Sequence, residues 1–206
     1  MPTSPSTQVR QHILDTARPI MVHKGFSAVG LNEILAAAGI PKGSFYHYFG
    51  SKEAFGEALL QSYFDSYLEH VDNLLVRSKG SAADRLLIYW QNWLDTQAND
   101  DYQCKCLAVK LGAEVSDLSD AMRQVLQDGS DRVIGRLAAC IEAGRADGSL
   151  VDIADSTHTA AALYQLWMGA TLVGKMRRDR KPLETAMTTT RQLLNLPPRR
   201  RRPARP

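Results

Sequence analysis

The sequence has few of the features that mark secreted, metal-binding or enzymatic proteins. Its 206 residues include only three cysteines, an odd number with no Cys-x-x-Cys pair, so we expect reduced thiols and no disulfide framework. It has no glycine-rich phosphate loop and no His-Glu-x-x-His sequence, and its five histidines are scattered. We therefore expect no enzymatic activity, no cofactor and no metal site.

Long apolar runs are missing as well. Residues 1–8 are polar and lead into no apolar segment, so we expect no secretory signal. The stretch 156–174 carries no formal charge and has the length of a membrane span, about 20 residues. Polar side chains interrupt it at Ser156, Thr157, His158, Thr159, Gln165 and Thr171. A buried helix explains this composition better, and we expect a cytoplasmic protein with no membrane partner.

The charge is small overall but unevenly distributed. Residues 1–52 hold five basic and two acidic residues, whereas residues 53–198 hold 15 basic and 20 acidic ones. Residues 199–206 hold five arginines and no acid. A basic N-terminal module on an acidic body favours contact with nucleic acid through that module alone. We interpret the arginine-rich end either as a nucleic-acid-binding arm or as a solvated terminus.

The stretch 31–49 has the pattern of a helix-turn-helix. It opens with apolar residues at helical spacing, namely Leu31, Ile34, Leu35 and Ala38. Two short helices joined by a tight turn that contains glycine form this motif. Gly39 suits the left-handed conformation that ends a helix, and Pro41 suits the first position of the next helix. The second segment, 42–48, is too short to be stable alone. Either its neighbours stabilise it by packing, or its exposed face has a role in binding.

The rest of the chain shows helical periodicity without strand-like alternation or an internal repeat. We predict an all-α fold of about nine helices. The predicted parts are a helix-turn-helix DNA-binding domain (1–50), a larger helical domain (51–198) and a disordered basic tail (199–206). Pro19 lies inside the first predicted helix, where a proline costs roughly 3 kcal/mol unless the helix kinks. We therefore expect a kink there.

Several of these segments resemble one family. The run GIPKGSFYHYFGSKEAF at 39–55 combines the glycine turn, the aromatic helix and the Ser-Lys-Glu helix start that are typical of the TetR family of bacterial transcriptional repressors. The segments CLAVKLGAEVSDLSDAMR and LYQLWMGATLVGK are similar to a subgroup of that family that responds to electrophiles and oxidants. The resemblance implies that the larger domain (51–198) serves regulation and dimerisation, with a homodimer formed through the last two helices. Each subunit is then expected to place its short helix in a major groove of palindromic double-stranded operator DNA.

The resemblance also implies which residues contact DNA. The positions that match base-facing or groove-facing residues are Lys42, Gly43, Ser44 and Tyr46, and those that match phosphate-contacting residues are His47, Tyr48 and Lys52. Gly43 fits this role because a missing side chain lets the backbone approach DNA closely. Lys52 also begins a helix, where backbone N–H groups favour phosphate. Phe45 and Phe49 are expected in the core, Tyr48 suits either place, and Lys52 is alternatively a solvated surface residue.

Cys106 is the candidate sensor of small electrophiles. It lies near a predicted helix start, beside Lys105 and four residues before Lys110, and such surroundings lower the pKa of a thiol. Judged from its apolar context alone, it is more often a small core residue. The resemblance favours the sensor, because Cys106 matches the reactive cysteine of the electrophile-responsive subgroup. Lys175 matches a lysine whose amine can trap or stabilise an oxidised sulfur. The other cysteines are Cys104, a weaker candidate, and Cys140, expected in the core.

A second interpretation keeps the repressor but replaces the covalent sensor with a pocket for a non-covalent small ligand. Its candidate lining is a set of aromatic side chains in the body, namely Trp90, Trp93, Tyr102, Tyr164 and Trp167. Aromatic stripes at helical spacing are also common in ordinary cores, so both interpretations are kept. A helical interaction module without DNA is a third class. Salt dependence separates it from a repressor, because operator binding weakens steeply as salt rises.

Overall fold

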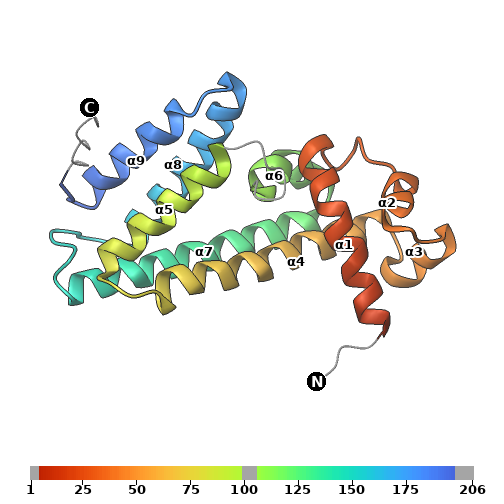
Figure 1. Cartoon of the computed structure of the whole chain (residues 1–206), viewed down its shortest axis with the longest axis horizontal. Helices are drawn as coiled ribbons and strands as arrows, with labels where there is room; N and C mark the ends of the chain where they lie inside the picture. Colours follow the sequence, from red (N-terminus) through yellow and green to blue (C-terminus); the bar gives the residue numbers. More distant parts are fainter. Residues whose placement is uncertain (1–4, 99–105, 198–206) are drawn as a thin grey trace, which may run out of the picture. The chain divides into compact units, whose positions relative to one another are not determined.

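The computed structural model describes residues 5–98 and 106–197. Within these two ranges the chain forms nine α-helices and one π-helical turn, with no β-strand (Figure 1). The predicted all-α fold is therefore confirmed. None of the helices in these ranges is long and apolar enough to cross a membrane.

The chain divides into two compact units. The first comprises residues 1–69 and 99–132, and the second comprises residues 70–98 and 133–206. The divisions fall inside two long helices, α4 (Lys52–Asp72) and α7 (Asp120–Ala146), so each of these helices contributes to both units. The boundary after residue 50 stays a prediction.

The first unit contains the expected helix-turn-helix. Besides parts of α4 and α7, its helices are α1 (Pro5–Lys24), α2 (Leu31–Ala38), α3 (Lys42–Phe49) and α6 (Leu107–Leu118). Helix α1 packs against α2 and α6, and α2 packs against α3. Helix α1 continues through Pro19 as a single helix. The core of this unit includes the fully buried side chains of Ile13, Ile34, Phe45 and Phe55.

Glycine ends both short helices of the motif. Gly39 has φ 67°, and its N–H and that of Ile40 close α2 on the carbonyls of Ala36 and Leu35. Gly50, at φ 72°, closes α3 through an N–H bond to Tyr46. Pro41 has extended backbone (φ −62°, ψ 144°) and precedes the first helical residue. The expectation that proline occupies the first helical position is thus wrong by one residue, because Pro41 serves as the cap.

Side chains cap the N-terminal ends of three longer helices, α4, α7 and α8. Ser51 Oγ accepts a hydrogen bond from Ala54 N at 3.0 Å, and Ser119 Oγ accepts one from Met122 N at 3.3 Å. Asp155 Oδ1 accepts one from His158 N at 2.9 Å. Each cap satisfies a backbone N–H that the helix itself leaves without a partner.

The second unit is built around three packed helices. They are α5 (Ala82–Ala98), α8 (Ser156–Arg177) and α9 (Lys181–Leu193), and the end of α4 leads into the π-helical turn η1 (Asn73–Arg77). Helix α9 packs against α8 and α5, and α5 packs against η1. The helical segment that begins at Lys52 therefore changes from α to π geometry in its last turn, which ends at Arg77.

Candidate nucleic-acid interface and sensor thiol

Helix α3 has one face packed in the core and another exposed. Phe45 is fully buried and Phe49 is 7% exposed, and their rings lie 5.4 and 5.1 Å from that of Phe55 on α4. These contacts confirm that the two phenylalanines belong to the core. They also fix the rotation of the helix, so that the remaining side chains are directed outward.

The predicted DNA-contacting residues of α3 all lie on this outer side. Tyr46 is 51% exposed. The other exposed residues are Lys42, Gly43 and His47, and the half-buried ones are Ser44 and Tyr48. A Cβ atom placed on Gly43 meets no atom within 4 Å, so no packing contact in the described protein requires glycine there. If glycine is required at this position, the reason therefore lies in a partner molecule that approaches Gly43 from outside the protein. Contact of these residues with DNA stays a prediction.

Lys52 is held at the start of α4. It is half-buried, and its ammonium Nζ lies 4.8 Å from the centroid of the Phe26 ring. A cation this close to an aromatic face is attracted by the ring. Lys52 is therefore a positioned cation and not a freely solvated one.

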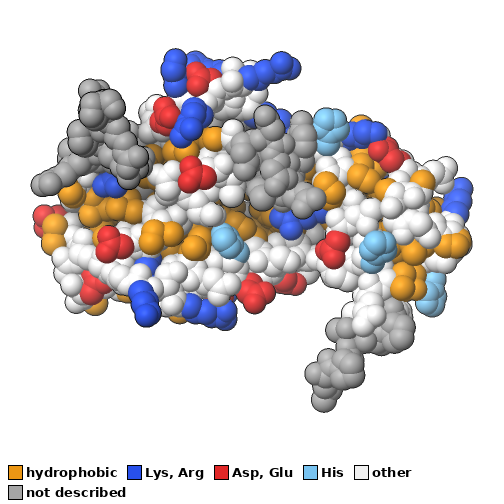
Figure 2. Space-filling view, in the orientation of Figure 1, with side chains coloured by type: hydrophobic (Ala, Val, Ile, Leu, Met, Phe, Trp, Pro, Cys, Tyr) orange, Lys and Arg blue, Asp and Glu red, His pale blue; other side chains and the backbone are white. Residues whose placement is uncertain are grey.

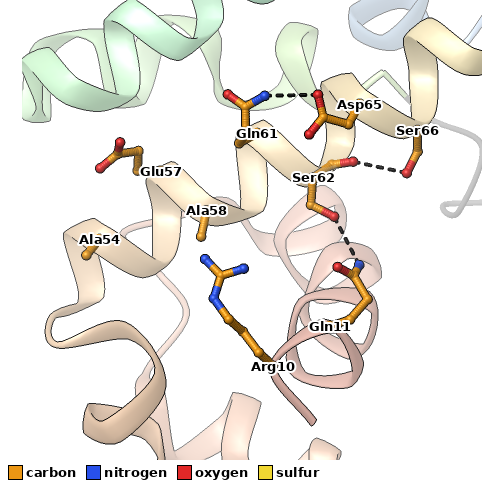
Figure 3. A pocket seen from close by; sticks show the side chains of 9 residues that line it. All are labelled: Arg10, Gln11, Ala54, Glu57, Ala58, Gln61, Ser62, Asp65 and Ser66. Atoms are coloured by element: carbon orange, nitrogen blue, oxygen red, sulfur yellow. Dashed lines mark hydrogen bonds between the residues drawn. The ribbon is translucent and has the colours of Figure 1, made fainter. Parts of the chain in front are cut away.

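A polar groove lies between α1 and α4 in the first unit. It encloses about 510 Å³ and is lined by Arg10, Gln11, Ala54, Glu57, Ala58, Gln61, Ser62, Asp65 and Ser66. Figure 3 shows the Arg10 guanidinium directed toward α4, and its Cζ lies 5.1 Å from the centroid of the Phe49 ring. Arg10 was not among the predicted site residues. The sequence signal that could have identified Arg10 is its charge within the basic N-terminal segment.

Cys106 lies where three helices of the first unit meet. It is the residue before α6, and its side chain is 8% exposed. The hydroxyl of Tyr63, on α4, donates a hydrogen bond to Cys106 Sγ at 3.4 Å. The guanidinium of Arg18, on α1, lies 5.0 Å from the centroid of the Tyr63 ring. Tyr63 thus connects the thiol to α4, and Arg18 connects Tyr63 to α1.

The pKa of the Cys106 thiol differs from the expectation. Burial raises this pKa above its ordinary value of 9.0. The hydrogen bond from Tyr63, the backbone N–H groups of Val109 and Ala108, and the charge of Arg18 oppose the effect but do not reverse it. The predicted lowering of the pKa is thus wrong, because burial outweighs the helix start. Sequence reasoning also missed Tyr63 and Arg18, which are distant in the chain.

Lys175 belongs to the second unit. It is exposed in the last turn of α8. Lys and Arg side chains gather over the turn between α8 and α9 (Figure 2), and this segment contains Lys175, Arg177, Arg178, Arg180 and Lys181. Cys106 belongs to the first unit, so the pairing of its thiol with Lys175 stays a prediction. Cys104 lies outside the described residues. Cys140 is 5% exposed, as expected of a core residue.

The predicted aromatic pocket residues form a packed cluster in the second unit. Trp90 and Trp167 are fully buried and stacked, with their centroids 4.9 Å apart. Trp93 Nε1 donates to Thr171 Oγ1 at 2.9 Å, and the Tyr164 ring meets Trp93 edge-on. These contacts match the core interpretation. A ligand site among these residues stays a prediction, and Tyr102 lies outside the described residues.

The short exposed helix presented by a glycine turn, followed by a helical body, defines a helix-turn-helix regulator. Residues 13–59 match the family model described as bacterial regulatory proteins, tetR family. Residues 82–190 match the model described as tetracyclin repressor-like, C-terminal domain. The chain belongs to the TetR family. Repressors of this family bind operator DNA and act as dimers.

The individual relatives agree with the predicted subgroup. The chain is 39% identical to the HTH-type transcriptional repressor NemR of Escherichia coli over 91% of this chain and 94% of that protein. It is 31% identical to the repressor DhaR of a Mycobacterium species over 91% of this chain and 93% of that protein. The crystal structure of reduced E. coli NemR superposes with a TM-score of 0.87, at 40% identity, over 92% of this chain and 98% of that one. The resemblance to the NemR subgroup is therefore confirmed.

Proposed function

We propose that this protein is a transcriptional repressor that leaves its palindromic operator when an electrophile or oxidant reacts with Cys106. The observation that carries the proposal is the position of this thiol. Cys106 contacts α4 through Tyr63, and α4 begins at Lys52, three residues after the last residue of α3. The sensor and the DNA-contacting residues therefore share one compact unit.

The proposed DNA contacts follow from the exposed face of α3. The residues that face the base edges or the major groove are Lys42, Gly43, Ser44 and Tyr46. Those that bind phosphates are His47, Tyr48 and Lys52. Two copies are needed to read a palindrome. We place the dimer contact on α8 and α9, which is supported by apolar side chains exposed on α8: Leu172 at 49%, Val173 at 38% and Met176 at 75%.

The proposed release step follows from the burial of the sensor. Because Cys106 is 8% exposed and its sulfur contacts Tyr63, an added group has no room unless the surrounding helices separate. Packed interiors do not absorb an extra group without displacement. Reaction at Cys106 thereby changes the arrangement of α1, α4 and α6, and the α3 face no longer fits its operator.

Operator binding before and after alkylation tests the proposal. The reduced protein selects its operator from random duplex DNA, and fluorescence anisotropy then measures the Kd with and without N-ethylmaleimide. We expect alkylation to weaken binding by roughly tenfold or more, a typical allosteric effect. The Cys106→Ser variant should keep its affinity, and Cys140→Ser serves as the matched control that still responds. Release undiminished in Cys106→Ser would contradict the proposal.

A non-covalent inducer held by the aromatic cluster is the second candidate. One observation favours it. Among the described residues Trp90 Nε1 is buried and has no hydrogen-bond acceptor, whereas Trp167 Nε1 donates to Thr190 Oγ1 at 2.8 Å. A ligand that brings an acceptor to Trp90 removes the cost of this unpaired donor. Thiol titration separates the two candidates, because a covalent inducer consumes a reactive thiol and a pocket ligand does not.

A further inference from the structure

The carboxylate of Glu114 connects α6 to the loop between α1 and α2. Its Oε1 accepts a hydrogen bond from Ser27 N at 2.6 Å, and its Oε2 accepts one from Phe26 N at 3.1 Å. Hydrogen bonds from backbone N–H groups to an ionised carboxylate are shorter and stronger than neutral ones. Both oxygens hold consecutive residues, so the carboxylate fixes the position and the direction of the loop.

The loop is shaped to receive this carboxylate. Gly25 has φ 97°, in the left-handed region that favours glycine. A Cβ atom at Gly25 would lie 2.9 Å from Glu114 Oε2. Any other residue at Gly25 is therefore strained and also crowds the carboxylate, which indicates that the close approach is a built feature of the loop.

Phe26 extends this connection to the start of α4. Its backbone is held by Glu114, and its side chain is 7% exposed. The ring lies against Gly56, where an added Cβ atom would come within 2.6 Å of Phe26 Cε2. The centroid of the ring also lies 4.8 Å from the Lys52 ammonium. Glu114, Phe26 and Lys52 thus form a continuous series of contacts within the first unit.

We propose that Glu114 is a positioning residue that places Lys52 for phosphate contact by holding Phe26. The inference rests on the proposed function and deepens it, because it names how α6 reaches the DNA-contacting face. Cys106 directly precedes α6 and lies eight residues before Glu114, a separation of about two helical turns. When reaction at Cys106 displaces α6, the carboxylate leaves the N–H groups of Phe26 and Ser27, and the aromatic support beneath Lys52 shifts.

A double-mutant cycle on operator affinity tests this directly. Glu114→Gln keeps the side-chain volume but replaces one acceptor oxygen with a donor, so the side chain no longer accepts from both N–H groups. We expect Glu114→Gln to weaken binding of the reduced protein by about fivefold or more. In a Lys52→Ala background the same change should cost less than about twofold, the scatter of independent sites. In a Lys42→Ala background Glu114→Gln should still weaken operator binding by about fivefold or more.

The salt dependence of binding supplies a readout that a merely structural defect does not move. Each phosphate contact contributes about 0.9 to the slope of log K against log salt. Glu114→Gln should lower this slope as much as Lys52→Ala does, with no further fall in the double variant. Asp117→Asn, which removes an exposed carboxylate from the same helix, is the matched control and should leave affinity and slope unchanged.

A second variant guards against loss of folding. Phe26→Leu keeps an apolar side chain in the loop but removes the aromatic face beneath Lys52. Like Glu114→Gln, it should therefore weaken operator binding less in the Lys52→Ala background than in the wild type. Circular dichroism verifies the helical content of every variant. The inference is wrong if Glu114→Gln and Phe26→Leu each weaken operator binding as much in the Lys52→Ala background as in the wild type. Failure of N-ethylmaleimide to release the wild type would instead contradict the sensor function and leave the result of the cycle intact.

Discussion

The Tyr63 hydroxyl donates a hydrogen bond to the Cys106 sulfur at 3.4 Å, between residues 43 positions apart in the chain. It opposes the effect of burial on the thiol pKa and joins α4 to the start of α6. The same contact therefore influences the pKa of the Cys106 thiol and the packing of two helices.

Replacing Tyr63 by Phe should slow alkylation of Cys106. The substitution removes the only polar atom of the Tyr63 side chain, and a hydrogen bond to a charged group is worth about 1.5–3 kcal/mol. Because the bond stabilises the thiolate, we expect the rate constant with N-ethylmaleimide at a fixed pH to fall by roughly tenfold. Cys104→Ser and Cys140→Ser in both proteins confine the reaction to Cys106. An unchanged rate would show that the hydrogen bond does not persist in the thiolate.

The alkylation rate of Cys106 should rise with pH without levelling off at the ordinary thiol pKa. Burial raises the pKa of Cys106 above 9.0, so the thiolate is a minor species at neutral pH. Below the raised pKa the thiolate fraction grows about tenfold per pH unit. We expect this slope to continue through pH 9, measured against a denatured sample of the same protein. A plateau below pH 8 would contradict it.

The folded state should lose part of its stability in acid through Glu114. Burial alone would raise the pKa of this carboxyl, but hydrogen bonds from Ser27 and Phe26 outweigh it and hold the pKa below the ordinary value of 4.5. A carboxyl with a lowered folded-state pKa stabilises the protein above the unfolded-state value, and this contribution disappears as the pH falls through the folded-state pKa. Urea unfolding between pH 6 and pH 3 measures the loss. In Glu114→Gln the decline should be shallower, with Asp117→Asn as the control.

Gly129→Ala should destabilise the first unit. A Cβ atom at Gly129, on α7, would lie 2.3 Å from the Phe64 ring on α4, and overpacking of this kind costs typically 1–3 kcal/mol. Gly112→Ala is the matched control, because a Cβ atom there meets nothing within 4 Å. At that helical position alanine is favoured over glycine by about 1 kcal/mol. Denaturant unfolding should therefore show effects of opposite sign, and equal effects would contradict the close packing of α4 against α7.

Local chemistry explains which features were predictable from the sequence. The end of α2 at Gly39 depends on residues within a few positions of one another, and this prediction was confirmed. The caps Ser51, Ser119 and Asp155 are local in the same way. The core role of Phe45 and Phe49 followed from a short helix that needs packing. The π-helical turn η1 was not predicted, because the apolar spacing near Leu75 is compatible with a continued α-helix.

Features that depend on residues far apart in the sequence could not be predicted. The raised pKa of Cys106 is due to burial beside Tyr63 and Arg18, and no pattern around Lys105 or Lys110 encodes that. Glu114 binds backbone N–H groups 87 and 88 positions away. Because a backbone N–H is present at every residue except proline, sequence offers no signal for the partner. The only indication was an acidic residue between the apolar positions of α6.

The passage of α4 and α7 through both units has a consequence for protein engineering. The chain crosses between the units at residues 69/70, 98/99 and 132/133, and two of these crossings cut a helix. A DNA-reading module transplanted as residues 1–69 alone would leave behind α6, with Glu114, and the start of α7, with Ser119. A chimaera with a relative must therefore exchange 1–69 and 99–132 as a matched pair, so that the helix-turn-helix keeps its own α6 and its own Cys106.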